Sequence, residues 1–447
     1  MDSVRSVWTS DEGTMAKETA AHRWPKIVQG MIDDVQVTCE SEDCSVEQKA
    51  EGQSIITKLT KLKDDIASDA SLLPLADDGI SSDIDGYNME LSFLPHCSWR
   101  KCPWLYAECY MYRYVQIVFS SSRHWKDYDV FRRQKDSTLR MSRRAVEELA
   151  HQFVTGVLDA NHSTAAGIHG DQAAQVIFRE MTELALWGNA TDLSLLTNLS
   201  LHDIQKLQTK RAAEENERSI VADDLAEVWQ LLRQNRGLPK ERRRMDIILD
   251  NAGFELFTDV LYASYLLEAG FASGITLHAK SFPWFVSDVT APDWDSLLEQ
   301  LEDPKVFPVR EHLDLLLACI KRHVDAGSLR LQVHPFWTTH HSFGVLSHEA
   351  PDLMKQLQDS YLTIWKGDLN YRKLTRDGLW PHTTPFQDAL GQLGHGSGVR
   401  ILSLRTNKSD TCVGVSEKRV LELEQEAPDK AWVKNGKYAV MSFSDGL

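Results

Sequence analysis

Two adjacent oxygen-bearing side chains, Asp250 and Asn251, follow a short apolar run at residues 247–249. This run is typical of a strand covered on both faces, and Gly253 then leads into a segment with apolar residues at helical spacing. In open α/β sheets, ligands bind beyond the carboxyl ends of the strands. Carboxylate and amide oxygens at such a position suit a hard divalent cation. A turn and helix cap would use the same residue types, so the pair alone leaves both interpretations open.

Polar side chains also follow other strands that the sequence predicts after residue 244. Strand-like segments at 274–280, 329–333, 361–365 and 399–404 alternate with helical segments, which predicts a mostly parallel sheet that residues 438–441 would complete. The carboxyl ends of parallel strands share one edge, so we expect the polar residues beyond them to meet there. These residues are Asp288, Lys366, Asp368, Asn370, Arg372, Arg405, Thr406 and Lys408.

The residue types at this edge indicate a metal and an anion clamp. Asp250, Asn251 and Asp288 would offer oxygen ligands to Mg²⁺ or Mn²⁺. The Lys and Arg side chains would offer a point charge and fork-shaped donors to a phosphate. Glu255 and Asp259 lie four residues apart, so they share one face of the predicted helix. Metal and anion clamp together are the equipment of phosphoryl transfer, although structural salt bridges and solvated loops use the same charged residues.

The elements that position these residues divide the chain into a helical half and an α/β half. We predict a mainly helical domain over 1–235 and a metal-binding catalytic domain over 236–447. Helices are predicted at 22–37, 53–67, from 103 onward, 142–157, 171–187 and 223–234. Connections are predicted at 41–52, 75–87 and 127–135, with a loop around Asn161, a cap at Asp192 and an exposed helix end at 209–218.

Three polar residues, Glu108, Tyr112 and Arg113, interrupt the otherwise apolar helix that begins after Pro103. Buried charged residues usually need partners. A structural ion pair and a contribution to the site therefore explain them equally well.

Composition excludes some classes of protein. The net charge of −16 over 447 residues argues against a nucleic-acid-binding surface, which would be basic. The seven cysteines, including the pairs Cys39/Cys44 and Cys97/Cys102, lack the spacing of a structural zinc site. We expect them to be reduced thiols in a cytoplasmic or nuclear protein. The first residues lack a signal-peptide core and no run of 18 apolar residues occurs, so we expect no membrane partner.

Five motifs resemble those of the damage-control phosphatase family. Asp-Asn-Ala-Gly-Phe-Glu-Leu begins at residue 250, Lys-Gly-Asp-Leu-Asn-Tyr-Arg-Lys-Leu at 366 and Arg-Thr-Asn-Lys at 405. In the first half, Pro-Trp-Leu-Tyr-Ala-Glu-Cys-Tyr begins at 103 and Leu-Trp-Gly-Asn-Ala-Thr-Asp-Leu-Ser at 186. The motifs are long and in order, and the likeness runs from about residue 20 to the end. It is greatest for the subgroup with an Arg-Thr-x-Lys motif, which is also described as acidic-residue methyltransferase-like.

The resemblance implies a helical N-terminal domain on a three-layer α/β/α, Rossmann-like domain with a mostly parallel sheet. It implies hydrolysis of small phosphorylated metabolites, such as fructose 1-phosphate and fructose 6-phosphate, with Mn²⁺, Mg²⁺, Co²⁺ or Ni²⁺. The residues that match catalytic metal ligands are Asp250, Asn251 and Asp288. The expected substrate-binding residues are Asp250, Asn251, Glu255, Lys366, Gly367, Asp368, Leu369, Asn370, Tyr371, Arg372, Arg405, Thr406 and Lys408.

Two other functions compete with hydrolysis. The family also carries a claim of S-adenosylmethionine-dependent methylation of protein glutamate side chains. Nucleoside cofactors commonly use a Gly-rich turn after the first strand, whereas this turn holds the single glycine Gly253 beside an Asp-Asn pair. A non-catalytic metabolite-binding protein is the third reading, and the intact ligand set Asp250, Asn251 and Asp288 weighs against it. The sequence makes no prediction of an oligomeric state.

Overall fold

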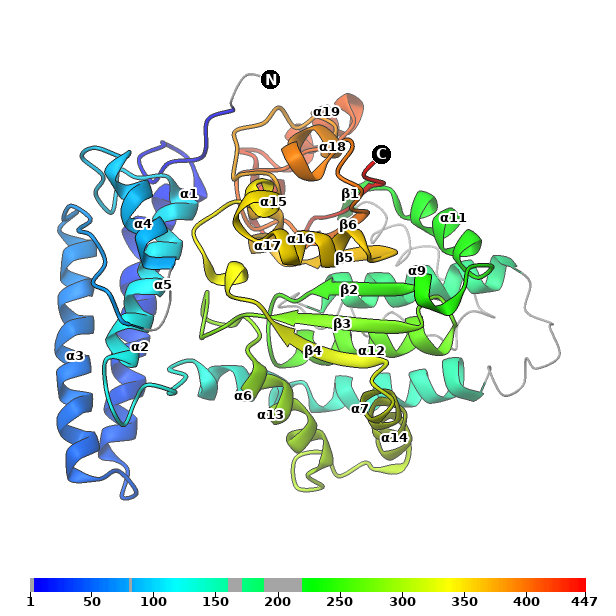
Figure 1. Cartoon of the computed structure of the whole chain (residues 1–447), viewed down its shortest axis with the longest axis horizontal. Helices are drawn as coiled ribbons and strands as arrows, with labels where there is room; N and C mark the ends of the chain where they lie inside the picture. Colours follow the sequence, from blue (N-terminus) through cyan, green and yellow to red (C-terminus); the bar gives the residue numbers. More distant parts are fainter. Residues whose placement is uncertain (1–3, 80–82, 160–170, 189–218) are drawn as a thin grey trace.

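The computed structural model describes residues 4–79, 83–159, 171–188 and 219–447. Their centre is a seven-stranded sheet with the order β1-β7-β6-β5-β2-β3-β4 (Figure 1). Strands β2 to β6 pair in parallel, β7 runs antiparallel to β6, and β1 is parallel to β7. The strands are β1 Ile220–Asp223, β2 Arg244–Ile248, β3 Gly274–Ala279, β4 Leu329–Val333, β5 Leu362–Lys366, β6 Ile401–Thr406 and β7 Ala439–Ser444. The expected mostly parallel sheet is confirmed.

Alternation along the strands creates two buried faces. Successive side chains of a strand point to opposite faces. Ile247 therefore packs into one hydrophobic cluster and Ile248 into another. The first cluster is covered by α7 Arg143–Phe153, α9 Asp171–Trp187, α11 Leu225–Asn235, α12 Phe254–Glu268, α13 Ala291–Glu302 and α14 Glu311–Asp325. The second is covered by α15 Leu346–Glu349, α16 Pro351–Gln358, α17 Gly367–Leu374, α18 Phe386–Ala389, α19 Glu417–Glu426 and α20 Ala431–Lys434. The α/β/α layering is confirmed.

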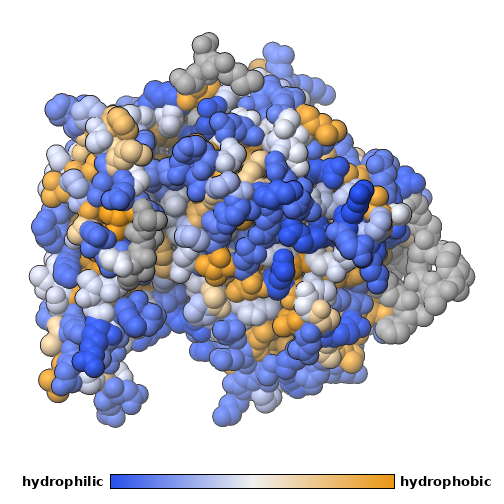
Figure 2. Space-filling view, in the orientation of Figure 1, coloured by the Kyte–Doolittle hydropathy of each residue, from blue (hydrophilic) through white to orange (hydrophobic). Residues whose placement is uncertain are grey.

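The N-terminal helices form a third hydrophobic cluster beside the sheet (Figure 1). Trp284 and Leu369 from the α/β part belong to this cluster and so join the two parts of the core. In the space-filling view, hydrophilic side chains dominate this face, and its lower outline is notched between the N-terminal helices and the part that carries the sheet (Figure 2). The helices are α1 Met15–Glu18, α2 Trp24–Glu40, α3 Val46–Ala67, α4 Asp83–Ser92 and α5 Trp104–Ser120.

The boundaries of several elements differ from the expected ones. Helix α3 begins at Val46, inside the predicted connection, because the Ser45 hydroxyl caps it by accepting from the Gln48 amide. Helix α4 begins inside the predicted loop 75–87. Helix α6, Arg132–Met141, begins inside the predicted connection 127–135. Strand β1 was not predicted. The predictions for Asn161, Asp192 and 209–218 lie outside the described residues.

The predicted domain division at residue 235 stays a prediction. The hydrophobic packing groups the chain differently, because α7, α9 and α11 pack in the same cluster as the sheet. Their buried side chains include Phe153, Trp187 and Trp229. The helices before residue 131 pack instead in a separate hydrophobic cluster.

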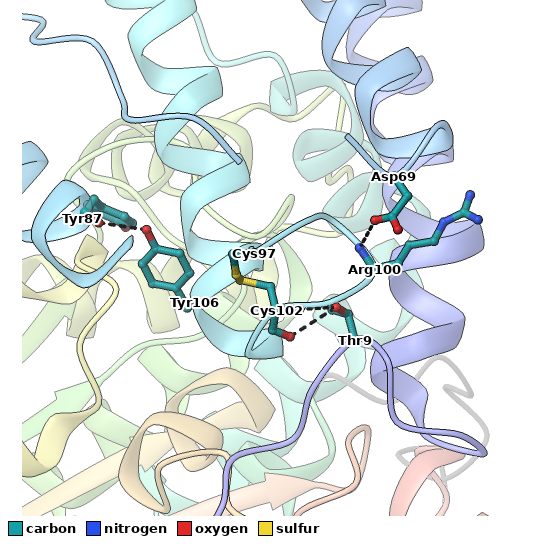
Figure 3. The surroundings of a disulfide bond; sticks show 7 residues. All are labelled: Thr9, Asp69, Tyr87, Cys97, Arg100, Cys102 and Tyr106. Atoms are coloured by element: carbon teal, nitrogen blue, oxygen red, sulfur yellow. Dashed lines mark hydrogen bonds between the residues drawn. A yellow bond between two sulfur atoms is a disulfide. The ribbon is translucent and has the colours of Figure 1, made fainter. Parts of the chain in front are cut away.

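The expectation of reduced thiols is wrong for one cysteine pair. Cys97 and Cys102 form a disulfide (Figure 3), because a turn between Ser98 and Lys101 brings their Cα atoms to 5.1 Å. The Cys102 backbone also exchanges hydrogen bonds with the Thr9 hydroxyl. Cys39, Cys44, Cys109, Cys319 and Cys412 are free thiols. In the described part of the chain, no helix combines the length and the apolarity needed to span a membrane.

Candidate active site

The strand order reverses between β2 and β5. From β2 the chain adds β3 and β4 on one side, and β5 and β6 then fill the other side. A crevice outside the carboxyl ends of the strands at such a switch point is the usual ligand site of an open α/β sheet. Asp250 and Asn251 follow β2, while Lys366 ends β5 and Gly367 begins α17. The topology therefore places the predicted motifs of both strands at the switch point.

The residues after β2 form a hydrogen-bonded acidic cluster with the segment after β3. The Asn251 amide donates to Asp250 Oδ2 at 2.6 Å and to Glu255 Oε2 at 2.7 Å. The backbones of Asn251 and Asp288 form an antiparallel bridge, and the Ser287 hydroxyl donates to Asn251 Oδ1. The structure therefore brings together Asp250, Asn251, Glu255 and Asp288.

Two buried lysines form salt bridges with carboxylates of this cluster. Lys280 Nζ lies 3.2 Å from Asp288 Oδ2 and donates to the Leu249 carbonyl at 3.0 Å. Lys366 Nζ donates to Glu255 at 3.0 Å and to Asp259 at 2.6 Å. The second pair of contacts confirms that Glu255 and Asp259 share one helix face. Lys366 is bonded to these two carboxylates, and its contact with a phosphate stays a prediction.

Burial shifts the pKa values of the charged groups in this cluster. Burial, followed by the nearby carboxylates Glu255 and Asp288, holds the pKa of Asp250 well above its usual range. Burial raises the pKa of Asp288 to about 6 and that of Asp259 to about 7, although lysines pull both down. Burial alone would lower the pKa of Lys366, but the carboxylates of Asp259 and Glu255 outweigh it and raise that pKa. Additional positive charge would therefore stabilise the ionised cluster.

Gly367 allows β5 to approach the Asp250 carboxylate. A Cβ at residue 367 would lie 1.9 Å from Asp250 Oδ2, and the Gly367 φ of 83° is disfavoured for other residues. The buried Asn370 amide ties the same strand ends together, since it donates to the Leu249 carbonyl at 3.1 Å and to the Lys366 carbonyl at 2.7 Å. Asn370 therefore fixes the backbone next to Asp250, and Gly367 leaves room for the Asp250 carboxylate.

The donor set fits a hard divalent cation. Asp250 and Asp288 are 5% and 2% exposed, and Asp288 Oδ2 forms the salt bridge with Lys280. Oxygen donors of this kind are typical ligands of Mg²⁺ and Mn²⁺. The Asn251 oxygen accepts from Ser287 while its NH₂ group faces Asp250, so this amide would have to turn over to present its oxygen to a metal beside Asp250.

The two predicted arginines are held by carboxylates. Arg372 donates to both oxygens of Asp377 at 3.0 Å and to Glu108 at 2.9 Å, and its guanidinium lies 3.6 Å from the centre of the Trp104 ring. Arg405 donates to Asp368 at 2.8 Å. Paired in this way, the guanidinium groups position the chain around the site. Direct contact of either arginine with a phosphate stays a prediction.

The remaining substrate-binding candidates surround Asp368. Asp368 Oδ1 also accepts a hydrogen bond from the backbone amide of Lys408 at 3.1 Å. The Lys408 side chain is half-buried, and its charge acts to lower the pKa of Asp250, opposing the larger effect of burial. The Thr406 hydroxyl is buried and makes no hydrogen bond within the described residues. Leu369 packs with the N-terminal cluster, and the Tyr371 hydroxyl accepts from the Val413 amide at 3.0 Å.

The polar residues of α5 have separate roles. Arg113 makes salt bridges of 2.8 Å with Asp78 and with Asp83, which is a structural ion network. Glu108 belongs instead to the Arg372 network and also accepts from the Trp24 indole at 3.1 Å. Tyr112 stacks on Phe285 with ring centres 4.8 Å apart. Glu108 therefore connects the N-terminal helices to α17, and Tyr112 connects them to the segment that precedes Asp288.

Sequence reasoning missed Lys280, Ser287 and Lys373. Lys280 follows the last residue of β3, a position that could have identified it as a site residue. Ser287 shows no comparable pattern. Lys373 is fully buried, donates to the Thr339 carbonyl at 2.6 Å and forms no salt bridge within the described ranges. Burial lowers the pKa of Lys373 to about 8.

A second group of potential metal ligands lies elsewhere. Glu268, Cys319 and His323 place one ligand atom each within 4.8 Å of one another. Glu268 ends the helix whose first turn carries Glu255, and 13 residues of helix separate them by roughly 20 Å. Arg322 also contacts the Glu268 carboxylate, so a guanidinium already pairs with this group.

Comparison with known proteins identifies the family. The model of the damage-control phosphatase ARMT1-like domain matches residues 19–423. The proteins named damage-control phosphatase ARMT1 from Xenopus tropicalis and Danio rerio are 33% and 32% identical to this chain. The alignments cover 100% of both chains for the first, and 97% of this chain and 95% of the relative for the second. A solved DUF89 family protein from Pyrococcus horikoshii has 14% identity and a TM-score of 0.40, with 96% of each chain covered. The chain therefore belongs to the ARMT1-like damage-control phosphatase family.

Proposed function

We propose that this protein is a metal-dependent phosphatase of small phosphorylated metabolites, with sugar phosphates of the fructose 1-phosphate and fructose 6-phosphate type as substrates. The observation that carries the proposal is the group of four buried carboxylates at the switch point, Asp250, Glu255, Asp259 and Asp288. Lys280 contacts Asp288, and Lys366 contacts Glu255 and Asp259. A divalent cation held by Asp250 and Asp288 would balance this charge.

The bound cation would supply Lewis-acid stabilisation of the transferred phosphoryl group. The chain itself orients the carboxylates: Gly367 gives Asp250 room, while Lys366 and Asn251 fix Glu255. Lys408, half-buried beyond β6, would offset phosphate charge on the side away from Asp288. Electrostatic contacts of this kind strengthen in a site from which water is excluded.

The direct test is phosphate release from a panel of sugar phosphates after chelation and after re-addition of each metal. We expect no release in chelator and restored release with at least one of Mn²⁺, Mg²⁺, Co²⁺ and Ni²⁺. Full activity in chelator would contradict the proposal. The same preparations should be offered S-adenosylmethionine and an acceptor protein. Strong methyl transfer that is lost in Glu255→Ala would favour the methyltransferase alternative instead.

A further inference from the structure

A cavity of about 650 Å³ lies where the N-terminal helices meet the α/β part. Helices α2 and α5 form one side of it, and residues 130–134 and 285–287 form the other. Its rings and aliphatic side chains include Ile27, Tyr112 and Phe131. Pockets for small molecules commonly measure about 300–1,000 Å³, so this cavity is large enough for a sugar carrying two charged groups.

The wall of the cavity reaches the acidic cluster. Ser287 lines the cavity, and its hydroxyl donates to Asn251, whose amide bonds Asp250. The neighbouring Phe285 and Val286 have φ values of 44° and 70°, which non-glycine residues rarely adopt and a β-branched residue adopts at a cost. Strained backbone of this kind persists where the surroundings impose it. The cavity is therefore continuous with the shell around the candidate active site.

The charged side chains that line the cavity differ in whether they form salt bridges. Arg133 pairs with Asp34, and Glu108 pairs with Arg372. Arg23 and Lys26 also line the cavity and are exposed, yet neither side chain makes a hydrogen bond or salt bridge within residues 4–79, 83–159, 171–188 and 219–447. Both lie at the start of α2. Their charge opposes the net charge of −16, so the cavity attracts anions to a protein that otherwise repels them.

We propose that this cavity is a second anion subsite of the active site. It receives a phosphate or carboxylate group that the substrate carries at the end away from the phosphate that is removed, and Arg23 and Lys26 recognise this group. The inference rests on the proposed phosphatase function and deepens it. Within the proposed substrate class, it predicts that a phosphorylated metabolite with a second anionic group binds more tightly than its singly anionic counterpart.

Two pairs of probes test the subsite. Fructose 1,6-bisphosphate is compared with fructose 1-phosphate, and 6-phosphogluconate with glucose 6-phosphate, in the wild-type protein and in Arg23→Gln/Lys26→Gln. The matched control is Arg123→Gln/Lys58→Gln, which removes the same charge from exposed residues outside the lining of the cavity. Exposed charged contacts are modest, so we expect the double variant to raise KM about fivefold for the doubly anionic member of a pair. The other member and the control should change less than about twofold.

Binding measurements distinguish a failure of this inference from a failure of the proposed function. Calorimetric affinities for the same four compounds, measured in chelator with Asp250 intact, do not require turnover. A preference for the doubly anionic compounds that disappears in Arg23→Gln/Lys26→Gln supports the subsite, even if none of the probes is hydrolysed. The pair that shows the preference tells whether the group is a phosphate or a carboxylate. Equal affinities within both pairs, or an equal loss for both members, would overturn the proposal.

Discussion

Two groups of buried charge surround the switch point, and they are built from different cations. After β2 and β3, Asp288 and Glu255 form salt bridges with lysines, and Asp250 accepts from Asn251 in the same cluster. Around α17, the carboxylates are held by Arg372 and Arg405, which also lie over the rings of Trp104 and Tyr371 at 3.6 and 4.3 Å. A guanidinium is a planar fork that can saturate a carboxylate, whereas an ammonium is a point charge.

The difference separates a reactive group from a supporting one. In the cluster with the lysines, the pKa values of Asp250 and Asp288 are raised, so a cation can still stabilise these carboxylates. In the group with the arginines, Glu108, Asp368 and Asp377 each accept from a guanidinium, although burial also raises the pKa of Asp377. Both groups looked alike in the sequence as polar runs after strands. We propose a metal site only for the first group, whose carboxylates are contacted by ammonium groups rather than by guanidinium forks.

The largest effect is expected at Asp250. Asp250→Asn keeps the shape of the side chain but removes the charge that a metal requires. We expect kcat/KM for phosphate release to fall by at least about 100- to 1,000-fold, the range for loss of a central electrostatic contribution. The melting temperature should hold or rise, because a buried charge is removed. Activity within tenfold of wild type would remove Asp250 from the site.

Arg372→Met tests the supporting group. It would leave Glu108 and Asp377 buried without their cation, which typically costs about 3–5 kcal/mol in the free energy of unfolding. Denaturant titration measures this change, and Arg123→Met at an exposed position should stay within about 0.5 kcal/mol. Unchanged stability with a large loss of activity would instead place Arg372 on the substrate and break the comparison.

Gly367→Ala tests the close approach between the strands. Its Cβ would collide with the Asp250 carboxylate, and we expect roughly a 100-fold loss of kcat/KM, as for a misplacement of about 1 Å. Gly270→Ala is the matched control, since Gly270 has a similar φ of 71° but open space around its Cα. Both variants should lose about 1–2 kcal/mol through the positive φ. Equal activity in the two would show that the contact with Asp250 does not matter.

Lys408→Ala is expected to have the smallest effect. Loss of one charge-assisted contact with the phosphate is worth about 1.5–3 kcal/mol, or roughly 10- to 150-fold in kcat/KM on fructose 1-phosphate. Metal affinity and melting temperature should change little. Lys408→Arg should restore part of the activity, because a fork replaces a point charge. A large fall in melting temperature would show that Lys408 is a structural salt bridge.

Local patterns were sufficient for the central elements. The apolar run before Asp250, the glycine at 253 and the apolar helical spacing that follows predicted β2 and α12, and both are present. Strand β1 escaped prediction because it has only four residues and pairs with β7, more than 200 residues away. The start of α6 escaped because its charged residue Lys135 is buried and pairs with Asp129 and with the distant Asp293.

The sequence by itself determined the residue types, the strands they follow and the family whose motifs they match. It did not determine which charges would meet. Only the tertiary structure pairs Lys366 with Glu255 and Asp259, which lie more than 100 residues away in the chain. It likewise pairs Arg372 with Glu108. The reason is physical: hydrophobic periodicity is a local property of the chain, whereas a salt bridge depends on a separation of a few ångströms that strand order and helix packing set.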